Sequence, residues 1–178
     1  HDNGHYESYF LRANHPDRPL AFWIRYTIFA PKKNPAANLG ELWVIVFDGE
    51  RQQVRAAKAE YPLAGCLFDP QQLDVRIGDA TLQAGALRGQ VQQGGTQISW
   101  NLTYQHGAEP VLLLPEKLYT TALPKAKALV ANPLARFSGE MQVNGETLRV
   151  DNWVGSENHN WGSKHTDEYA WGQVAGFD

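Results

Sequence analysis

The feature that most constrains this chain is a series of short apolar runs separated by turn-forming residues, with no long amphipathic helical segment between them. The clearest run spans residues 95–104, where Ile98, Trp100, Leu102 and Tyr104 alternate with polar side chains. Successive side chains of a strand point to opposite faces of the sheet, so this two-residue period indicates a half-buried strand. A chain built from many such runs is expected to be all-β.

Further strands are predicted where β-branched and aromatic residues gather between Gly, Pro, Asn and Asp. These segments are Tyr6 to Ala13, Leu20 to Ala30, Glu41 to Asp48, Gln52 to Glu60, a meander from Leu73 to Val91, a hairpin over 137–150 that turns at Asn144 and Gly145, and a last strand from Tyr169 to Phe177. The stretch 111–132 mixes both periods around two prolines. We expect strand and loop there, and the pattern leaves a short helical turn open.

A closed barrel and a two-sheet sandwich both suit this pattern, and we favour a lipocalin-like antiparallel barrel. The run Leu42 to Phe47 is apolar throughout, which implies that another sheet, domain or subunit covers its second face. A length of 178 residues fits one domain, so residues 1–178 are expected to form a single barrel. The last strand, from about residue 168, would lead into a second barrel beyond this sequence. A homodimer is the other partner that we consider.

Composition excludes several classes of function. Sixteen basic and nineteen acidic residues give a formal net charge of −3 without a basic run, so nucleic acid is not an expected partner. No apolar run approaches the roughly 18 residues of a membrane-spanning helix. The six histidines lack metal-ligand spacing and no dinucleotide or phosphate-binding glycine pattern is present, so neither a metal nor a cofactor is expected. The cellular compartment, cytoplasmic or periplasmic, stays open.

The densest group of candidate functional residues lies near the end of the chain. It consists of Asn152, Trp153, Glu157, His159, Asn160 and Trp161, followed by Trp171 and Gln173. Indole rings offer rigid apolar walls, whereas Glu157 and His159 can donate or accept protons. Two residues apart in an extended segment, these two side chains should point to the same side. We therefore expect strands that curl around a cavity, with this block at its mouth and Glu157 and His159 as catalytic candidates; packing of a barrel end is the structural alternative.

Two earlier strands add candidates for ligand binding. Trp23 and Arg25 lie on the second predicted strand and Glu7 lies on the first. Because these strands are expected to be neighbours, Glu7 and Arg25 could pair inside the barrel, either as a structural ion pair or as part of the site.

The order of motifs resembles a known superfamily. Phe-Ser-Gly-Glu-Met-Gln-Val-Asn-Gly-Glu-Thr-Leu-Arg-Val at 137–150, the Trp-containing polar block and Tyr-Ala-Trp-Gly-Gln at 169–173 are similar to the AttH-like and hydroxyneurosporene synthase (carotenoid 1,2-hydratase) superfamily. Fungal Diels-Alderase-type cyclases are similar in the same way. The resemblance implies two consecutive lipocalin-like barrels and a lipophilic, isoprenoid- or polyene-like substrate.

Three functions remain open at this stage. The first is cofactor-independent hydration, isomerisation or cyclisation of a lipophilic small molecule, with Glu157 or His159 moving the proton and Trp rings stabilising cationic character. The second is a carrier that binds such a molecule without converting it. The third is a structural half whose apolar surface packs against a following barrel, with the site at the joint.

Overall fold

The computed structural model describes residues 4–32, 34–164, 168, 170 and 172–174. Its elements, in chain order, are β1 (His5–Asn14), β2 (Leu20–Ala30), η1 (Pro35–Ala37), β3 (Leu39–Asp48), β4 (Gln53–Pro62), η2 (Leu63–Gly65), β5 (Leu67–Phe68), β6 (Asp74–Ile77), β7 (Ala80–Gln83), β8 (Ala86–Gln93), β9 (Thr96–Gln105), β10 (Val111–Leu112), η3 (Glu116–Leu118), β11 (Ala126–Val143) and β12 (Glu146–Gly162). The described residues form no α-helix. The prediction of an all-β fold is confirmed.

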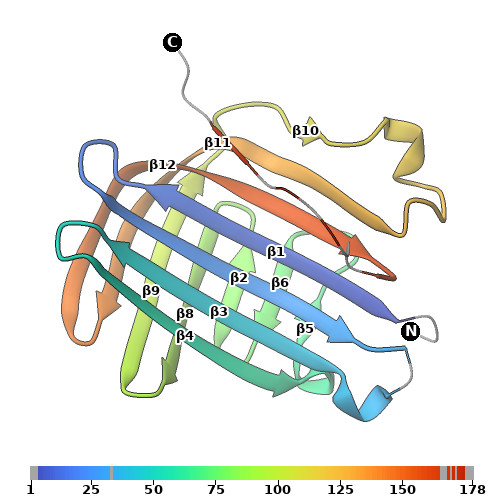
Figure 1. Cartoon of the computed structure of the whole chain (residues 1–178), viewed down its shortest axis with the longest axis horizontal. Helices are drawn as coiled ribbons and strands as arrows, with labels where there is room; N and C mark the ends of the chain where they lie inside the picture. Colours follow the sequence, from blue (N-terminus) through green and yellow to red (C-terminus); the bar gives the residue numbers. More distant parts are fainter. Residues whose placement is uncertain (1–3, 33, 165–167, 169, 171, 175–178) are drawn as a thin grey trace.

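The strands form one antiparallel sheet that curls into a half-barrel (Figure 1). Its order is β4-β3-β2-β1-β12-β11-β9-β8-β7-β6-β5, and β10 pairs with β11. In Figure 1 the strands from β4 to β11 make the front layer, and β5 to β9 lie behind them. One end of this order, β4, lies against β8 without pairing to it as a strand: the Lys58 amide on β4 donates to the side chain of Gln93 on β8, at 2.8 Å.

The predicted hairpins are confirmed by their registers. β1 and β2 pair with Leu11 opposite Ile24, and β11 and β12 meet at a two-residue turn. At this turn Asn144 and Gly145 have φ of 51° and 86°, the conformation of a tight hairpin turn that these two residue types adopt most readily. In the stretch 111–132 the structure has β10, the short η3 turn and the start of β11.

The structure differs from the prediction of a last strand from Tyr169 to Phe177. Residues 169, 171 and 175–177 lie outside the described residues, and the described ones in that range, 170 and 172–174, lie in no strand. Gln173 instead uses its backbone carbonyl to accept a hydrogen bond from the side chain of Arg12 on β1, at 3.5 Å, so this residue lies against the face of the sheet.

The core fills the concave side of the sheet. Large side chains from both layers are almost fully buried there, including Phe22, Tyr26, Trp100, Phe137 and Trp153. Phe22 packs edge-on against Phe137 and stacks on Trp153, with ring centroids 5.4 and 6.0 Å away. The Trp100 indole donates to the Tyr26 hydroxyl at 3.2 Å, which satisfies a polar group in the core.

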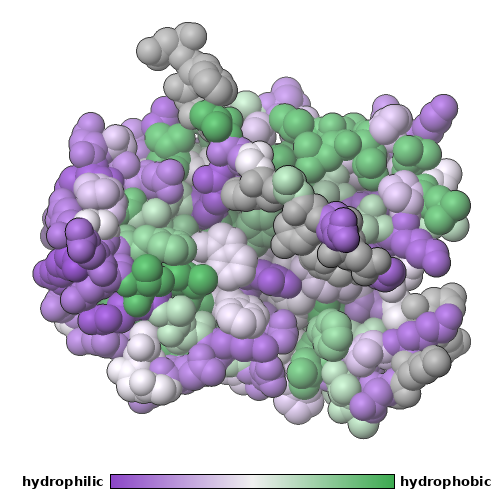
Figure 2. All heavy atoms as spheres, viewed as in Figure 1, coloured by the Kyte–Doolittle hydropathy of each residue, from purple (hydrophilic) through white to green (hydrophobic). Residues whose placement is uncertain are grey.

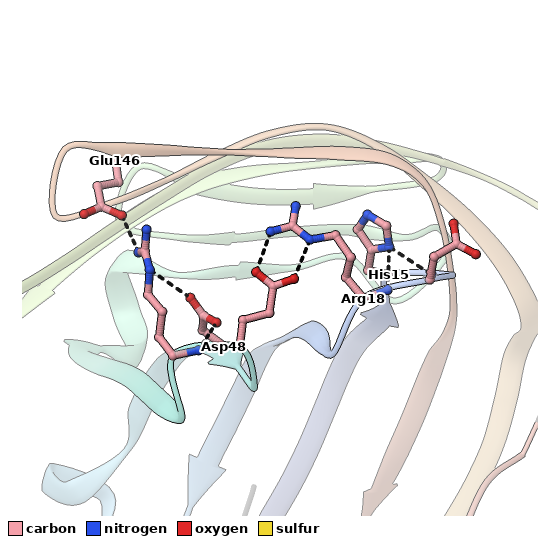
Figure 3. Close-up of polar contacts among 7 residues, drawn as sticks. His15, Arg18, Asp48 and Glu146 are labelled. Atoms are coloured by element: carbon pink, nitrogen blue, oxygen red, sulfur yellow. Dashed lines mark hydrogen bonds and ion pairs between the residues drawn. The ribbon is translucent and has the colours of Figure 1, made fainter.

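Charged side chains join the hairpin turns at one end of the half-barrel (Figure 3). Arg18 forms a bidentate ion pair with Glu50, and Arg51 links the β3–β4 turn to Glu146 at the start of β12, at 2.6 Å. His15 accepts hydrogen bonds from two backbone amides and so organises the β1–β2 turn. These ion pairs are solvent-exposed, so we interpret them as contacts that hold the turns together and not as a functional site.

Candidate functional site

The candidate residues divide between the two faces of the sheet. On β1 and β12 the side chains of Glu7, Glu157 and His159 point to the concave, inner side. Trp23, Arg25 and Asn160 line a groove on the convex, outer side. The expectation that Glu157 and His159 share a side is confirmed, because they are two apart in one strand.

The inner group is centred on the Glu7 carboxylate. His159 and His5 approach its two oxygens through Nε2 at 3.0 and 2.9 Å, and the Tyr9 hydroxyl donates to it at 3.0 Å. The His159 ring stacks on Tyr9, and on its other neighbour Trp161 at 4.4 Å between centroids. Burial alone would raise the pKa of Glu7, but the hydrogen bonds from His159, His5 and Tyr9 and the charge of His159 outweigh it and lower the pKa to about 2. Glu7 is therefore ionised at all physiological pH values.

Glu157 has the opposite environment. Its side chain is buried, with 5% of the residue exposed, and faces Tyr104 and His106 from β9 and the loop after it. Burial raises the pKa of Glu157, and the Tyr104 hydroxyl and the nearby histidines only partly offset this effect. The two inner carboxylates thus differ in proton affinity.

The expected pairing of Glu7 with Arg25 is wrong. The β1–β2 register places Glu7 opposite Ile28 and Arg25 opposite Phe10. Side chains alternate along each strand, so Glu7 points inward while Arg25 points outward. The partners of Glu7 come from β1 and β12 instead.

A groove of about 740 Å³ lies on the outer face. Its walls come from β1, β2, β3, β11 and β12 and from the segment after β10. Apolar members include Phe10, Trp23, Ile45, Phe47, Leu113 and Trp161. Figure 2 shows this face, with hydrophobic areas over β10 and left of centre and hydrophilic side chains between them. The expected cavity thus lies outside the half-barrel, because the buried aromatic residues of the core occupy the inside.

Arg25 provides the polar centre of this groove. Its Nε donates to the hydroxyls of Ser8 and Thr27 at 2.9 and 2.8 Å, and its Nη2 donates to the Tyr6 hydroxyl at 2.8 Å. The guanidinium also lies over the rings of Tyr6 and Trp23, 5.7 and 5.9 Å from their centroids. Ser8 and Thr27 are almost fully buried, although they face away from the core.

Described residues near the C-terminus lie on the same face. Gln173, a predicted binding residue, contacts the sheet twice: its carbonyl accepts from Arg12, and its side-chain oxygen lies 3.3 Å from the Ser156 hydroxyl. Ser156 in turn accepts from Asn158, at 2.9 Å. Ala170 and Lys164 also line the groove. Trp171 lies outside the described residues.

Two predicted binding residues lie elsewhere. Trp153 is 1% exposed and belongs to the core, where it contacts Phe22 and His15. Asn152 is exposed and adopts a φ of 54° at an irregularity of the β11–β12 ladder, with its amide bonded to the Ser138 hydroxyl. Asn adopts the left-handed backbone region more readily than most residues. Asn152 therefore serves the backbone conformation at this irregularity and not ligand binding.

Each face also contains residues that the sequence pattern did not single out as candidates. Tyr9, Tyr104 and His106 join the inner group, and Phe10, Ile45 and Asn158 line the groove. The sequence contained a signal for the groove. On β1 and β3, Phe10 and Ile45 are apolar although the alternation places them on the face opposite the core.

The described residues contain no group of three or more His, Cys, Asp or Glu side chains arranged to hold a metal ion. Nor do they include a helix of the length and apolar character needed to cross a membrane.

No family model matches the chain. An uncharacterised protein of Mycobacterium tuberculosis, found in strains H37Rv and CDC 1551, is 26% identical over 171 residues, which cover 94% of this chain and 48% of the relative. The chain therefore spans about half the length of the curated relatives it matches.

Solved structures show the fold. An AttH-type protein from Nitrosomonas europaea superposes with a TM-score of 0.66 at 18% identity, over 94% of this chain and 54% of the other. Kievitone hydratase from Nectria haematococca gives a TM-score of 0.62 at 14% identity, over 92% and 48%. The predicted likeness to AttH-type, lipocalin-like proteins is confirmed for the fold.

Proposed function

We propose that this chain binds an apolar small molecule in the outer groove. The observation that carries the proposal is the groove itself: about 740 Å³, walled largely by aromatic and aliphatic side chains, with a few polar groups at its base. This volume and lining are typical of small-molecule sites. Exposed apolar surface of this kind also marks sites of interaction rather than ordinary protein surface.

We further propose that a second barrel, carried by the rest of a longer protein, adjoins this face. The relatives and structural neighbours are about twice as long as this chain, and Lys164 and Ala170, near the end of this sequence, line the groove. The ligand would then lie at or near a joint between two barrels. A homodimer would cover the same surface from another copy.

Conversion of the ligand is the second candidate function, and Glu157 favours it. A buried carboxyl group with a raised pKa can keep its proton nearer to neutral pH, as a general acid requires. Its position on the inner face separates it from the groove. Trp161 connects the two regions, because it lines the groove and stacks on His159. We therefore place binding before conversion. Hydration or cyclisation of an isoprenoid- or polyene-like substrate is the chemistry proposed for Glu157 and His159.

The neutral fluorophore N-phenyl-1-naphthylamine tests the binding proposal. We expect saturable binding that the Ile45→Asn substitution weakens about fivefold or more, since it places an amide in the apolar wall. Val54→Asn is the matched control, because Val54 is exposed on β4 and does not line the groove. Absence of saturable binding, or equal binding by the wild type and Ile45→Asn, would contradict the proposal.

A further inference from the structure

The charged residues of the groove share one sign. Among the described residues that line it, Arg12, Arg25, Lys127 and Lys164 are cationic and none is acidic. The chain as a whole carries a net charge of −3, so this concentration of positive charge is local. A low-polarity groove with charge of one sign attracts ligands of the other sign.

Arg25 is the cation best placed to meet a ligand. Two of the other cations are engaged with backbone carbonyls: Arg12 donates to Gln173, and the Lys127 ammonium donates to Tyr119 and Thr121. Arg25 contacts only hydroxyl groups and aromatic rings, and within the described part of the chain it forms no ion pair. Partly buried charges are normally paired, so a guanidinium without a carboxylate suggests that its counterion comes from outside.

The hydrogen bonds of Arg25 also orient it. They use Nε and Nη2, and the three hydroxyls that accept them come from β1 and β2. A guanidinium has five N–H groups in a fixed plane, so the edge formed by Nη1 and the second hydrogen of Nη2 remains for another acceptor. This edge matches the two oxygens of a carboxylate. The hydroxyls thus hold the side chain in position over the groove floor.

We propose that the ligand of the groove is an anionic amphiphile, an apolar chain or ring system that carries a carboxylate, and that Arg25 binds its anionic end. This inference rests on the proposed binding function and specifies its ligand class. Phe10, Trp23, Ile45 and Phe47 would contact the apolar body.

The test compares ligands with the same tail. Dodecanoate and 1-dodecanol are used to displace N-phenyl-1-naphthylamine from the wild type and from Arg25→Met, at pH 8 and 150 mM salt. Hydrogen bonds to charged groups are worth enough for about a tenfold effect or more, so the preference for the acid over the alcohol should fall by about tenfold in Arg25→Met. Arg88→Met is the matched control, because Arg88 is exposed on β8 and does not line the groove.

A second comparison needs no variant and so does not depend on the folding of Arg25→Met. In the wild type, dodecyltrimethylammonium should displace the fluorophore about tenfold less effectively than dodecanoate. If the acid preference changes by less than about threefold in Arg25→Met, or if the cationic amphiphile competes as well as the acid, the inference is wrong while the binding proposal stands. If neither the fluorophore nor 1-dodecanol binds, the binding proposal itself fails.

Discussion

At the scale of single residues, two carboxylates on the inner face have opposite relations to pH. Glu7 accepts hydrogen bonds from His5, His159 and Tyr9, which stabilise its ionised form. Glu157 lies deeper, where burial favours the protonated form. The same residue type therefore contributes to stability with opposite signs on neighbouring strands.

Glu7→Gln should destabilise the protein most at neutral pH. The pKa of Glu7 is lowered from 4.5 to about 2, so its stabilising effect is fully present above pH 4.5 and is lost as the pH falls towards 2. We expect the free energy of unfolding of the wild type to exceed that of Glu7→Gln by about 2–3 kcal/mol at pH 6. This difference should shrink towards pH 2.5. Urea unfolding at several pH values measures it. Glu146→Gln, on an exposed ion pair, should show no such trend, and a pH-independent difference for Glu7→Gln would contradict this assignment.

Glu157→Gln should act in the opposite direction. Burial raises the pKa of Glu157 in the folded protein. The free energy of unfolding therefore decreases as the pH rises through 4.5, the pKa of a glutamate in the unfolded chain, and beyond. A neutral amide avoids this cost, so the variant should melt roughly 2–4 °C higher than the wild type at pH 8. The advantage should disappear below about pH 4, where Glu157 is protonated in both states. Thermal unfolding at pH 4 and pH 8 decides the matter, and a variant less stable than the wild type at pH 8 would refute the assignment.

At the scale of elements, the β1–β12 pairing joins the N-terminal and C-terminal strands of the front layer and brings Glu7 close to His159. It pairs Ala13 with Gly155 and Tyr9 with His159, residues about 150 positions apart in the chain. A Cβ on Gly155 would lie 1.8 Å from the backbone oxygen of Arg12, so this crossing requires glycine for close approach of the two strands.

Gly155→Ala should therefore separate β1 from β12 locally. We expect a loss of about 2–3 kcal/mol in the free energy of unfolding, because backbone rather than a flexible side chain must move. Gly65→Ala is the control, since its added Cβ would meet no atom within 4 Å apart from the neighbouring residues of its own chain segment. Denaturant unfolding of both variants provides the comparison. Equal stability of Gly155→Ala and the wild type would show that the strands are not held this closely.

At the scale of the whole molecule, one sheet supplies both layers and one core lies between them. If one layer unfolds, the core side chains of the other layer become exposed to water. We therefore expect a single cooperative unfolding transition. The six tryptophans, which include Trp100 on β9 and Trp153 on β12, report through fluorescence on their surroundings in both layers, whereas far-UV circular dichroism reports on all strands. The two signals should change together in urea. Transitions with distinct midpoints would mean that the front and rear layers unfold separately.

The curvature of the whole sheet separates the groove from the two catalytic candidates, Glu157 and His159. The curled sheet fills its concave side with aromatic residues, which leaves the outer face as the hollowed surface. Residues from one sequence block are thereby divided: Glu157 and His159 face the core, whereas Asn158 and Asn160 face the groove.

The sequence by itself determined most of the strands, their hairpins and the all-β class, because a two-residue period and turn residues are local properties. It also determined that Glu157 and His159 share a face. Only the tertiary structure decided which face that is, that Glu7 pairs with His159 rather than Arg25, and that Trp153 belongs to the core while Trp23 lines the groove. Alternation defines two faces but does not state which one curls inward, since that depends on the packing of strands distant in the chain.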